Sequence, residues 1–152
     1  MTRILSIDPG AEYYAYAEWY DGRLKGAGLL GIDTPFALIG FPVVVIEKPR
    51  VYDRSARDKA AAKGGSVVDL AIAVGRLVER APYAVELVLP ETWKGQTPKR
   101  VHHPRILASL TSGERSLLEG MRKKDLGHVL DAIGIGLYHL NKTGARPADK
   151  GE

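Results

Sequence analysis

The chain has 152 residues, of which 45% are hydrophobic and 26% charged, as is typical of one globular domain and too apolar for a disordered chain. It has no cysteine, which excludes disulfides, zinc–thiolate sites and thiol catalysis. The 22 Lys and Arg residues against 18 Asp and Glu give a formal net charge of +4, which is compatible with a polyanionic partner. The start of the chain does not resemble a signal peptide and no apolar run approaches membrane-spanning length, so we expect a soluble, cytoplasmic protein.

The first predicted element is a short buried strand that ends in a carboxylate. Ile4, Leu5 and Ile7 form a short apolar run, Asp8 follows, and Pro9-Gly10 turns the chain. A carboxylate at the end of a core strand is held rigidly where the sheet opens to solvent, which suits a metal ligand or a general base. The alternative is that Asp8 only forms the turn, because Asp before Pro-Gly is common turn chemistry.

Three more strands are expected before residue 50. Residues 13–19 (YYAYAEW) and 23–32 flank the hairpin signal Asp21-Gly22, so the first three strands form an antiparallel meander. Residues 34–40 are too few for more than one helical turn. Residues 43–46 are apolar on both faces, which indicates a central strand covered by helices on both sides.

This central strand also ends in a carboxylate, Glu47, with a proline two residues further on. The arrangement repeats that of Asp8, and two such strand ends in one domain are harder to attribute to chance. The alternative is a local ion pair of Glu47 with Lys48 or Arg50.

A charged segment, a helix and a fifth strand follow. Residues 51–65 indicate a mobile loop or the frayed start of a helix. Ser66 is a good N-cap for a helix whose apolar residues recur at helical spacing through Val78. Residues 85–89 predict the fifth strand.

A basic stretch follows this strand and contains Trp93 and two adjacent histidines. Its cations could neutralise phosphates while Trp93 packs against a sugar or base, and equally Trp93 could fill the edge of the core. His102 and His103 point apart with no carboxylate within helical reach, so we do not expect a metal site there. The candidate DNA contacts in this stretch are Trp93, Lys94, Lys99 and Arg100.

The last part of the chain predicts two helices and a tail. A capping-box pattern at residues 111–114 opens a short helix through Met121. Residues 123–141 form the clearest helix, whose small residues at 132, 134 and 136 would let it approach a sheet closely. Residues 1–141 are expected to form one domain, and residues 142–152, which are polar with Gly and Pro, are expected to be disordered.

The last helix also carries His128 and Asp131, three residues apart and on one face. By themselves they could form a local ion pair or a hydrogen bond. Together with Asp8 and Glu47, however, they give three carboxylates and an imidazole from three elements. Such a set would bind two divalent cations, Mg²⁺ or Mn²⁺, about 4 Å apart, as in phosphodiester hydrolysis.

These motifs resemble the RuvC family of Holliday-junction resolvases, within the RNase H-like (retroviral integrase) superfamily. The resemblance is carried by ILSIDPG at the start, VVVIEKP in the middle and HVLDAIGIGLYHL at the end, and it extends over residues 4–140. It implies a catalytic, metal-binding tetrad of Asp8, Glu47, His128 and Asp131. It further implies a homodimer that makes paired nicks across a four-way DNA junction, with water as the nucleophile.

The chain departs from the family pattern at two places. Bacterial RuvC has a longer helical insertion where this chain has residues 34–40, and a threonine–glycine pair where this chain has YYAYAEW. Because residues 34–40 form so short a connection, the chain is more similar to the phage-encoded members of the family than to the bacterial enzyme. The family inserts aromatic or basic side chains at the junction centre from the loop that corresponds to residues 49–65. The candidates in and beside this loop are Lys48, Arg50, Tyr52 and Arg54.

The sequence thus predicts an α/β, RNase H-like domain with a five-stranded mixed sheet, the first three strands antiparallel, and helices on both faces. The predicted function is a Mg²⁺-dependent endonuclease that resolves Holliday junctions. The alternatives are a related nuclease acting on flaps, branched DNA or RNA–DNA hybrids, and a non-cleaving DNA-binding protein of the same fold. An actin-like ATP-binding domain is disfavoured because a second half and further phosphate-binding loops are missing.

Overall fold

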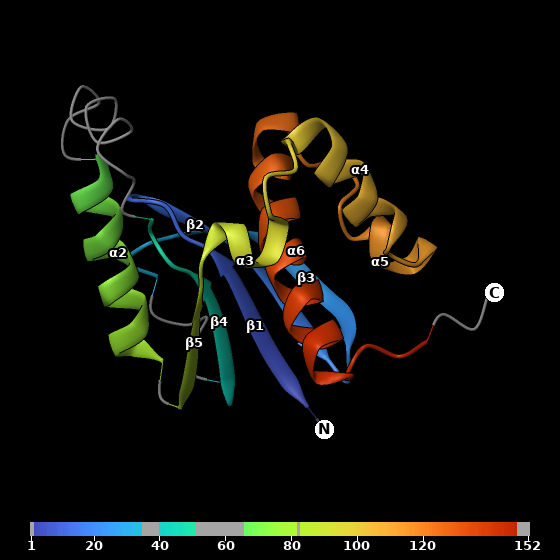
Figure 1. Ribbon diagram of the computed structural model, residues 1–152, viewed down its shortest axis with the longest axis horizontal. Helices are drawn as coiled ribbons and strands as arrows, with labels where there is room; N and C mark the ends of the chain where they lie inside the picture. Colours follow the sequence, from blue (N-terminus) through green and yellow to red (C-terminus); the bar gives the residue numbers. More distant parts are fainter. Residues whose placement is uncertain (1, 35–39, 51–65, 82, 149–152) are drawn as a thin grey trace.

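A computed structural model describes residues 2–34, 40–50, 66–81 and 83–148, and its centre is a five-stranded mixed sheet in the order β3-β2-β1-β4-β5 (Figure 1). The strands are β1 (Arg3–Asp8), β2 (Tyr13–Tyr20), β3 (Arg23–Gly31), β4 (Val43–Glu47) and β5 (Ala84–Val88). The first three strands pair antiparallel, whereas β4 pairs parallel with both β1 and β5. The predicted sheet is confirmed. Residues 35–39 and the charged segment 51–65 lie outside the described residues.

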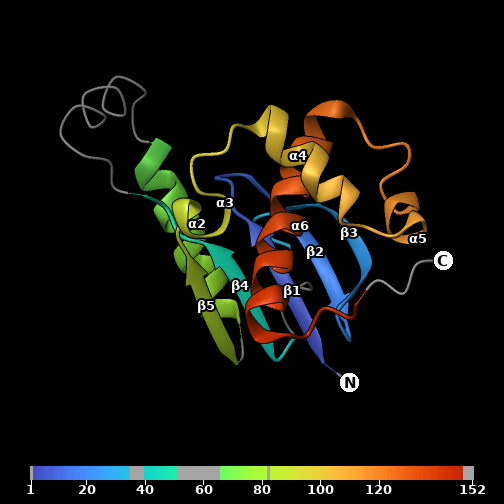
Figure 2. The ribbon, with the colours of Figure 1, turned by 45° about the vertical axis from the view of Figure 1, so that its right-hand side comes forward.

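Helices cover both faces of this sheet, as the apolar run of β4 predicted (Figures 1 and 2). The helices are α2 (Ser66–Arg80), α3 (Pro90–Lys94), α4 (Lys99–Ala108), α5 (Ser112–Ser116) and α6 (Lys123–Thr143). Because side chains alternate along a strand, Val44 and Ile46 face the core under α2, and Val45 faces the core under α6. None of the helices within these described ranges is long and apolar enough to cross a membrane.

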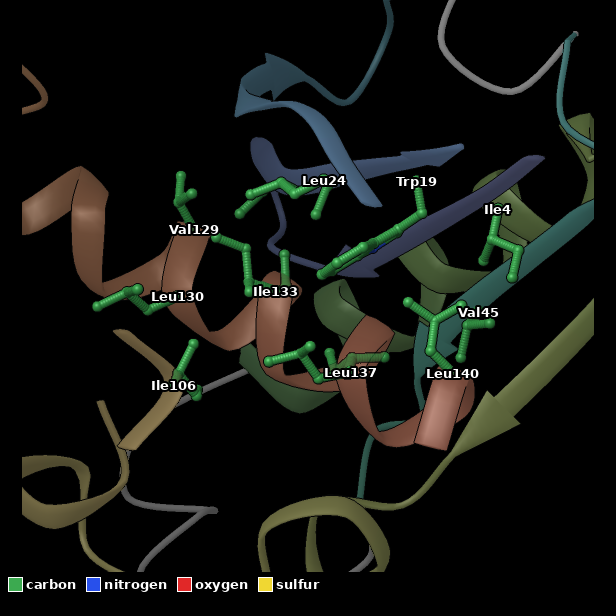
Figure 3. Close-up of a cluster of buried hydrophobic side chains, with 14 of the residues drawn as sticks. Ile4, Trp19, Leu24, Val45, Ile106, Val129, Leu130, Ile133, Leu137 and Leu140 are labelled. Carbon is green, nitrogen blue, oxygen red and sulfur yellow. The ribbon is translucent and has the colours of Figure 1, made fainter. Parts of the chain in front are cut away.

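Two glycines of α6 allow close packing on two sides of the helix: Gly136 faces β1 and β2, and Gly134 faces α3 and α4. A Cβ atom at Gly136 would overlap the Trp19 ring and the Ser6 hydroxyl, and one at Gly134 would overlap the Trp93 ring. The space thus left lets the Ser6 hydroxyl donate a 2.7 Å hydrogen bond to the carbonyl of Ala132. Figure 3 shows the Trp19 ring packed between the sheet and this helix. The backbone of α6 is thereby fixed relative to β1.

The capping box at residues 111–114 is present, but the helix that it opens is shorter than predicted. Helix α5 ends at Ser116, and the following residues form turns up to Gly120, whose φ of 80° is incompatible with a continuing right-handed helix. The prediction of a helix through Met121 is therefore wrong.

The end of the described chain also differs from the sequence prediction. Helix α6 continues to Thr143, and Arg146 then donates hydrogen bonds to the Glu114 carboxylate and to the carbonyls of Gly22 and Ser109. The expected disorder of residues 142–152 is thus wrong for residues 142–148, and residues 149–152 lie outside the described part of the chain. The composition of residues 142–148 does not indicate this contact, because its partner, Glu114, is remote in sequence.

Candidate active site

Two carboxylates lie next to each other at one edge of the sheet. The parallel register pairs Ile7 of β1 with Ile46 of β4, so Asp8 and Glu47 are the next residues of the two neighbouring strands. Side chains two residues apart in a strand point to the same face of the sheet. Asp8 therefore shares the face of Ser6, and Glu47 shares the face of Val45, which is the face covered by α6. Their side chains are largely buried, at 12% exposure for Asp8 and 18% for Glu47.

Helix α6 brings the other two predicted residues to this edge. His128 Nδ1 lies 3.3 Å from Asp8 Oδ2. Asp131 is buried, and it directly precedes Ala132, whose carbonyl is fixed by Ser6. The three elements β1, β4 and α6 therefore bring together all four residues of the predicted tetrad.

The segment that connects β5 to α6 supplies partners for two of these carboxylates. The indole Nε1 of Trp93, on α3, donates a 2.6 Å hydrogen bond to Glu47 Oε2, and Lys94 Nζ lies 3.9 Å from the same oxygen. On α4, His103 Nε2 lies 2.8 Å from Asp131 Oδ1, and Lys99 Nζ lies 3.3 Å from Asp131 Oδ2.

His103 belongs to this site, although the sequence predicted no role for it. Two adjacent histidines first suggest metal ligands, whereas the useful signal is that Lys99 and His103 are four residues apart. On a helix this spacing puts an ammonium group and an imidazole on one face, ready for a common acidic partner. That Asp131 is this partner depends on how α4 packs against α6.

Burial and the charges of neighbouring acids shift the ionisation of Asp8 and Glu47. Burial raises the pKa of Asp8, an effect that the hydrogen bond from His128 opposes and the charge of Asp131 reinforces. Burial likewise raises the pKa of Glu47, and the charges of Asp8 and Asp131 add to it while Trp93 and Lys94 oppose it. The three carboxylates therefore lie close enough to repel one another, which favours a bound cation.

The donor set fits a hard divalent cation, since it consists of carboxylates with one imidazole. In the part of the chain that the structure describes, however, no three His, Asp or Glu side chains are arranged to hold one ion together. The carboxylates are instead held separately, by Trp93, His103 and His128. A cation at this edge would compete with Lys94 and Lys99 for the same acidic groups.

Most of the candidate DNA contacts that the structure describes are exposed cations near this edge. Lys48, Arg50, Lys99 and Arg100 are exposed and Lys94 is partly buried; Arg50 lies 3.8 Å from Glu91. Trp93 does not suit stacking on a base, because it is only 9% exposed and its ring packs against α6. The structure agrees with the alternative interpretation, that Trp93 fills the edge of the core. Tyr52 and Arg54 lie outside the described residues.

No protein-family model and no curated protein matches the chain, but solved structures do. RuvC of Thermus thermophilus, in complex with a Holliday junction substrate, matches with a TM-score of 0.60 at 16% identity over 95% of this chain and 98% of RuvC. The Fowlpox virus resolvase, in complex with Holliday junction DNA, matches with a TM-score of 0.58 at 16% identity over 93% and 99% of the two chains. The yeast mitochondrial Holliday junction resolvase Ydc2 matches with a TM-score of 0.54 at 11% identity over 95% and 80%. The chain therefore has the RNase H-like fold of the RuvC-type resolvases, as the sequence resemblance predicted.

Proposed function

We propose that the chain is a divalent-metal-dependent endonuclease that resolves four-way DNA junctions by paired, symmetric nicks. The observation that carries this proposal is the convergence of Asp8, Glu47 and Asp131 on one sheet edge, where the charge of Asp131 raises the pKa of Asp8 and the charges of Asp8 and Asp131 raise the pKa of Glu47. The likeness in fold supports a four-way DNA junction as the substrate, because two solved structures of similar fold are resolvases in complex with Holliday junctions.

Asp8, Glu47, His128 and Asp131 are the residues that would hold the metal. Two bound Mg²⁺ or Mn²⁺ ions would supply an activated water and stabilise the oxygen that leaves the scissile phosphate. The protein contributes a partly buried site whose acids repel one another, and His128 orients Asp8 through its Nδ1. Lys94 and Lys99 lower the negative charge that an incoming phosphate would meet.

Exposed cations around the site are proposed to bind the phosphates of the junction. Lys48 and Arg50 follow β4, and Lys99 and Arg100 begin α4, so the two pairs flank the carboxylates. Tyr52 and Arg54 remain candidates for contacts at the junction centre.

A homodimer is proposed because two symmetric nicks require two active sites. Helix α2 offers an apolar patch for this contact, since Val68 and Ile72 lie one turn apart and are 62% and 53% exposed. Residues 1–141 would form the nuclease domain of each subunit.

The proposal is tested by incubating the protein with Mg²⁺ and synthetic four-way junctions, flaps, duplexes and RNA–DNA hybrids. We expect symmetric nicks in the junction, and we expect an Asp8→Asn variant to bind the junction without cutting it. Cleavage that persists in Asp8→Asn would remove the carboxylate site from the mechanism. Cleavage of flaps or hybrids but not junctions would point to a related nuclease, and junction binding without any cleavage would point to a non-cleaving DNA-binding protein.

A further inference from the structure

Helices α3 and α4 place two ring nitrogens against the acids of the candidate metal site. Trp93 contacts Glu47 and His103 contacts Asp131, each through a single carboxylate oxygen. We propose that Trp93 and His103 are positioning residues, which hold one oxygen of each acid so that the carboxylate keeps the orientation needed for a cation. This inference rests on the proposed metal-dependent function.

The Trp93 ring is held in one orientation by its packing in the protein core. Its ring is 9% exposed and packs against Gly134 and Ile106, and a Cβ atom on Gly134 would lie 2.5 Å from ring atom Cζ3. The ring cannot rotate without displacing α6, so the direction of its N–H bond is set by core packing. An indole nitrogen can only donate, so it binds a carboxylate but never a cation.

The hydrogen bond from Trp93 leaves the second carboxylate oxygen of Glu47, Oε1, available to a cation. Trp93 and Lys94 both approach Oε2, and no hydrogen bond to Oε1 is formed within the described part of the chain. Trp93 therefore orients Glu47 by holding one of its two carboxylate oxygens.

His103 has the corresponding role for Asp131. Its side chain is 18% exposed, and its Nε2 lies 2.8 Å from Oδ1 of an acid that is itself only 7% exposed. His102 lies between the two positioning residues, with its ring centroid 4.9 Å from that of Trp93 and 6.1 Å from that of His103. The three rings form one packed cluster, so a displacement of either positioning residue would disturb the other.

Metal-site acids that lose such a partner typically lose about 10- to 100-fold in metal affinity. The test is the dissociation constant of Mn²⁺, measured by isothermal titration calorimetry on the intact protein without DNA. Trp93→Phe keeps an aromatic ring in the core and removes the N–H, and we expect it to weaken Mn²⁺ binding by about 10-fold or more. Tyr20→Phe is the control, because it removes a hydrogen-bonding group from another aromatic ring, whose partner is Arg3, at the end of β1 opposite Asp8.

His103 offers a rescue test that a purely structural role would not pass. We expect His103→Leu to weaken Mn²⁺ binding and His103→Gln to restore most of it, since the Gln amide nitrogen can donate near the position of Nε2. Equal losses in the Leu and Gln variants would overturn the assignment for His103. Circular dichroism and thermal melting establish that each variant is folded.

Trp93 fluorescence provides a second readout that needs no substitution of Trp93. Mg²⁺ is expected to change the tryptophan emission of the wild-type protein but not that of Glu47→Gln. If the Trp93→Phe and His103→Leu variants bind Mn²⁺ as tightly as the wild-type protein does, the inference is overturned and the proposed function is left intact. Wild-type protein that binds no Mn²⁺ would instead overturn the proposed metal site itself.

Discussion

The hydroxyl of Ser6 in β1 donates a 2.7 Å hydrogen bond to the carbonyl of Ala132 in α6, the residue that follows Asp131. The same hydroxyl oxygen accepts a 3.0 Å hydrogen bond from the Trp19 indole. Ser6 is two residues before Asp8, so this buried bond sets how Asp8 and Asp131 face each other. The strand that carries one acid and the helix that carries another are thus joined a short distance below the site.

Ser6→Ala is expected to lower the free energy of unfolding by about 1–3 kcal/mol, because it leaves the buried Trp19 N–H without its acceptor. Urea denaturation of the variant measures the loss. Ser109→Ala is the control, since among the described residues its exposed hydroxyl bonds only the nearby Arg105 carbonyl, and it should change stability by less than about 0.5 kcal/mol. Similar losses in the two variants would contradict the role given to Ser6.

Substitution of glycine by alanine should lower the stability of the protein at Gly136 and raise it at Gly75. Gly136→Ala inserts a methyl group against Trp19 and Ser6, and overpacking of this kind costs about 1–3 kcal/mol. Gly75→Ala, on the exposed side of α2 where a Cβ meets nothing within 4 Å, should stabilise the protein by about 0.5–1 kcal/mol. Thermal melting of both variants checks the prediction, and a stabilised Gly136→Ala would show that α6 can move away from the sheet.

The local patterns of the sequence predicted the sheet and the positions of its acids well. The apolar runs at residues 4–7 and 43–46 each end in one acid, and a parallel pairing of two such strands brings the acids together without further information. The small residues of α6 likewise predicted a close approach to the sheet, which the contacts of Gly136 with Trp19 and Ser6 confirm, whereas Gly134 instead makes room for Trp93 of α3.

The contacts that depend on packing between distant segments could not be predicted in this way. Trp93 is hydrophobic and aromatic, so its composition suits either a DNA contact or a core position, and only the fit of its ring against Gly134 decides between them. Arg146 belongs to a segment whose composition indicates disorder, yet Glu114, 32 residues earlier, anchors it.

Phosphate contacts predict a specific salt dependence of junction binding. Replacing Lys48 or Arg100 by Gln should weaken binding to junctions of any sequence, because exposed cations of this kind contact phosphates and not bases. Each lost contact should also reduce the slope of log K against log salt by about 0.9. Fluorescence anisotropy in Ca²⁺ or without metal, over a series of salt concentrations, measures both quantities.

Lys25→Gln is the matched control for this experiment. It removes one exposed cation from β3, near the end of the sheet opposite Asp8, and it should leave the salt slope unchanged. A slope that falls equally in all three variants would indicate that net charge alone, and not the placement of the cations, determines binding.

The buried pair of Glu114 and Arg146 predicts how stability depends on pH. Although burial alone would raise it, hydrogen bonds from Arg146 and from the backbone of Thr111 and Leu24 lower the pKa of Glu114 from 4.5 to about 2. The unfolded chain therefore binds this proton more readily than the folded protein, so the stabilisation is complete above pH 4.5 and is lost as the pH falls towards about 2. Its size is on the order of 3 kcal/mol. Urea denaturation between pH 2 and 6 should show a steeper loss of stability for the wild-type protein than for Glu114→Gln. Parallel curves would show that Arg146 does not hold this carboxylate in its charged form.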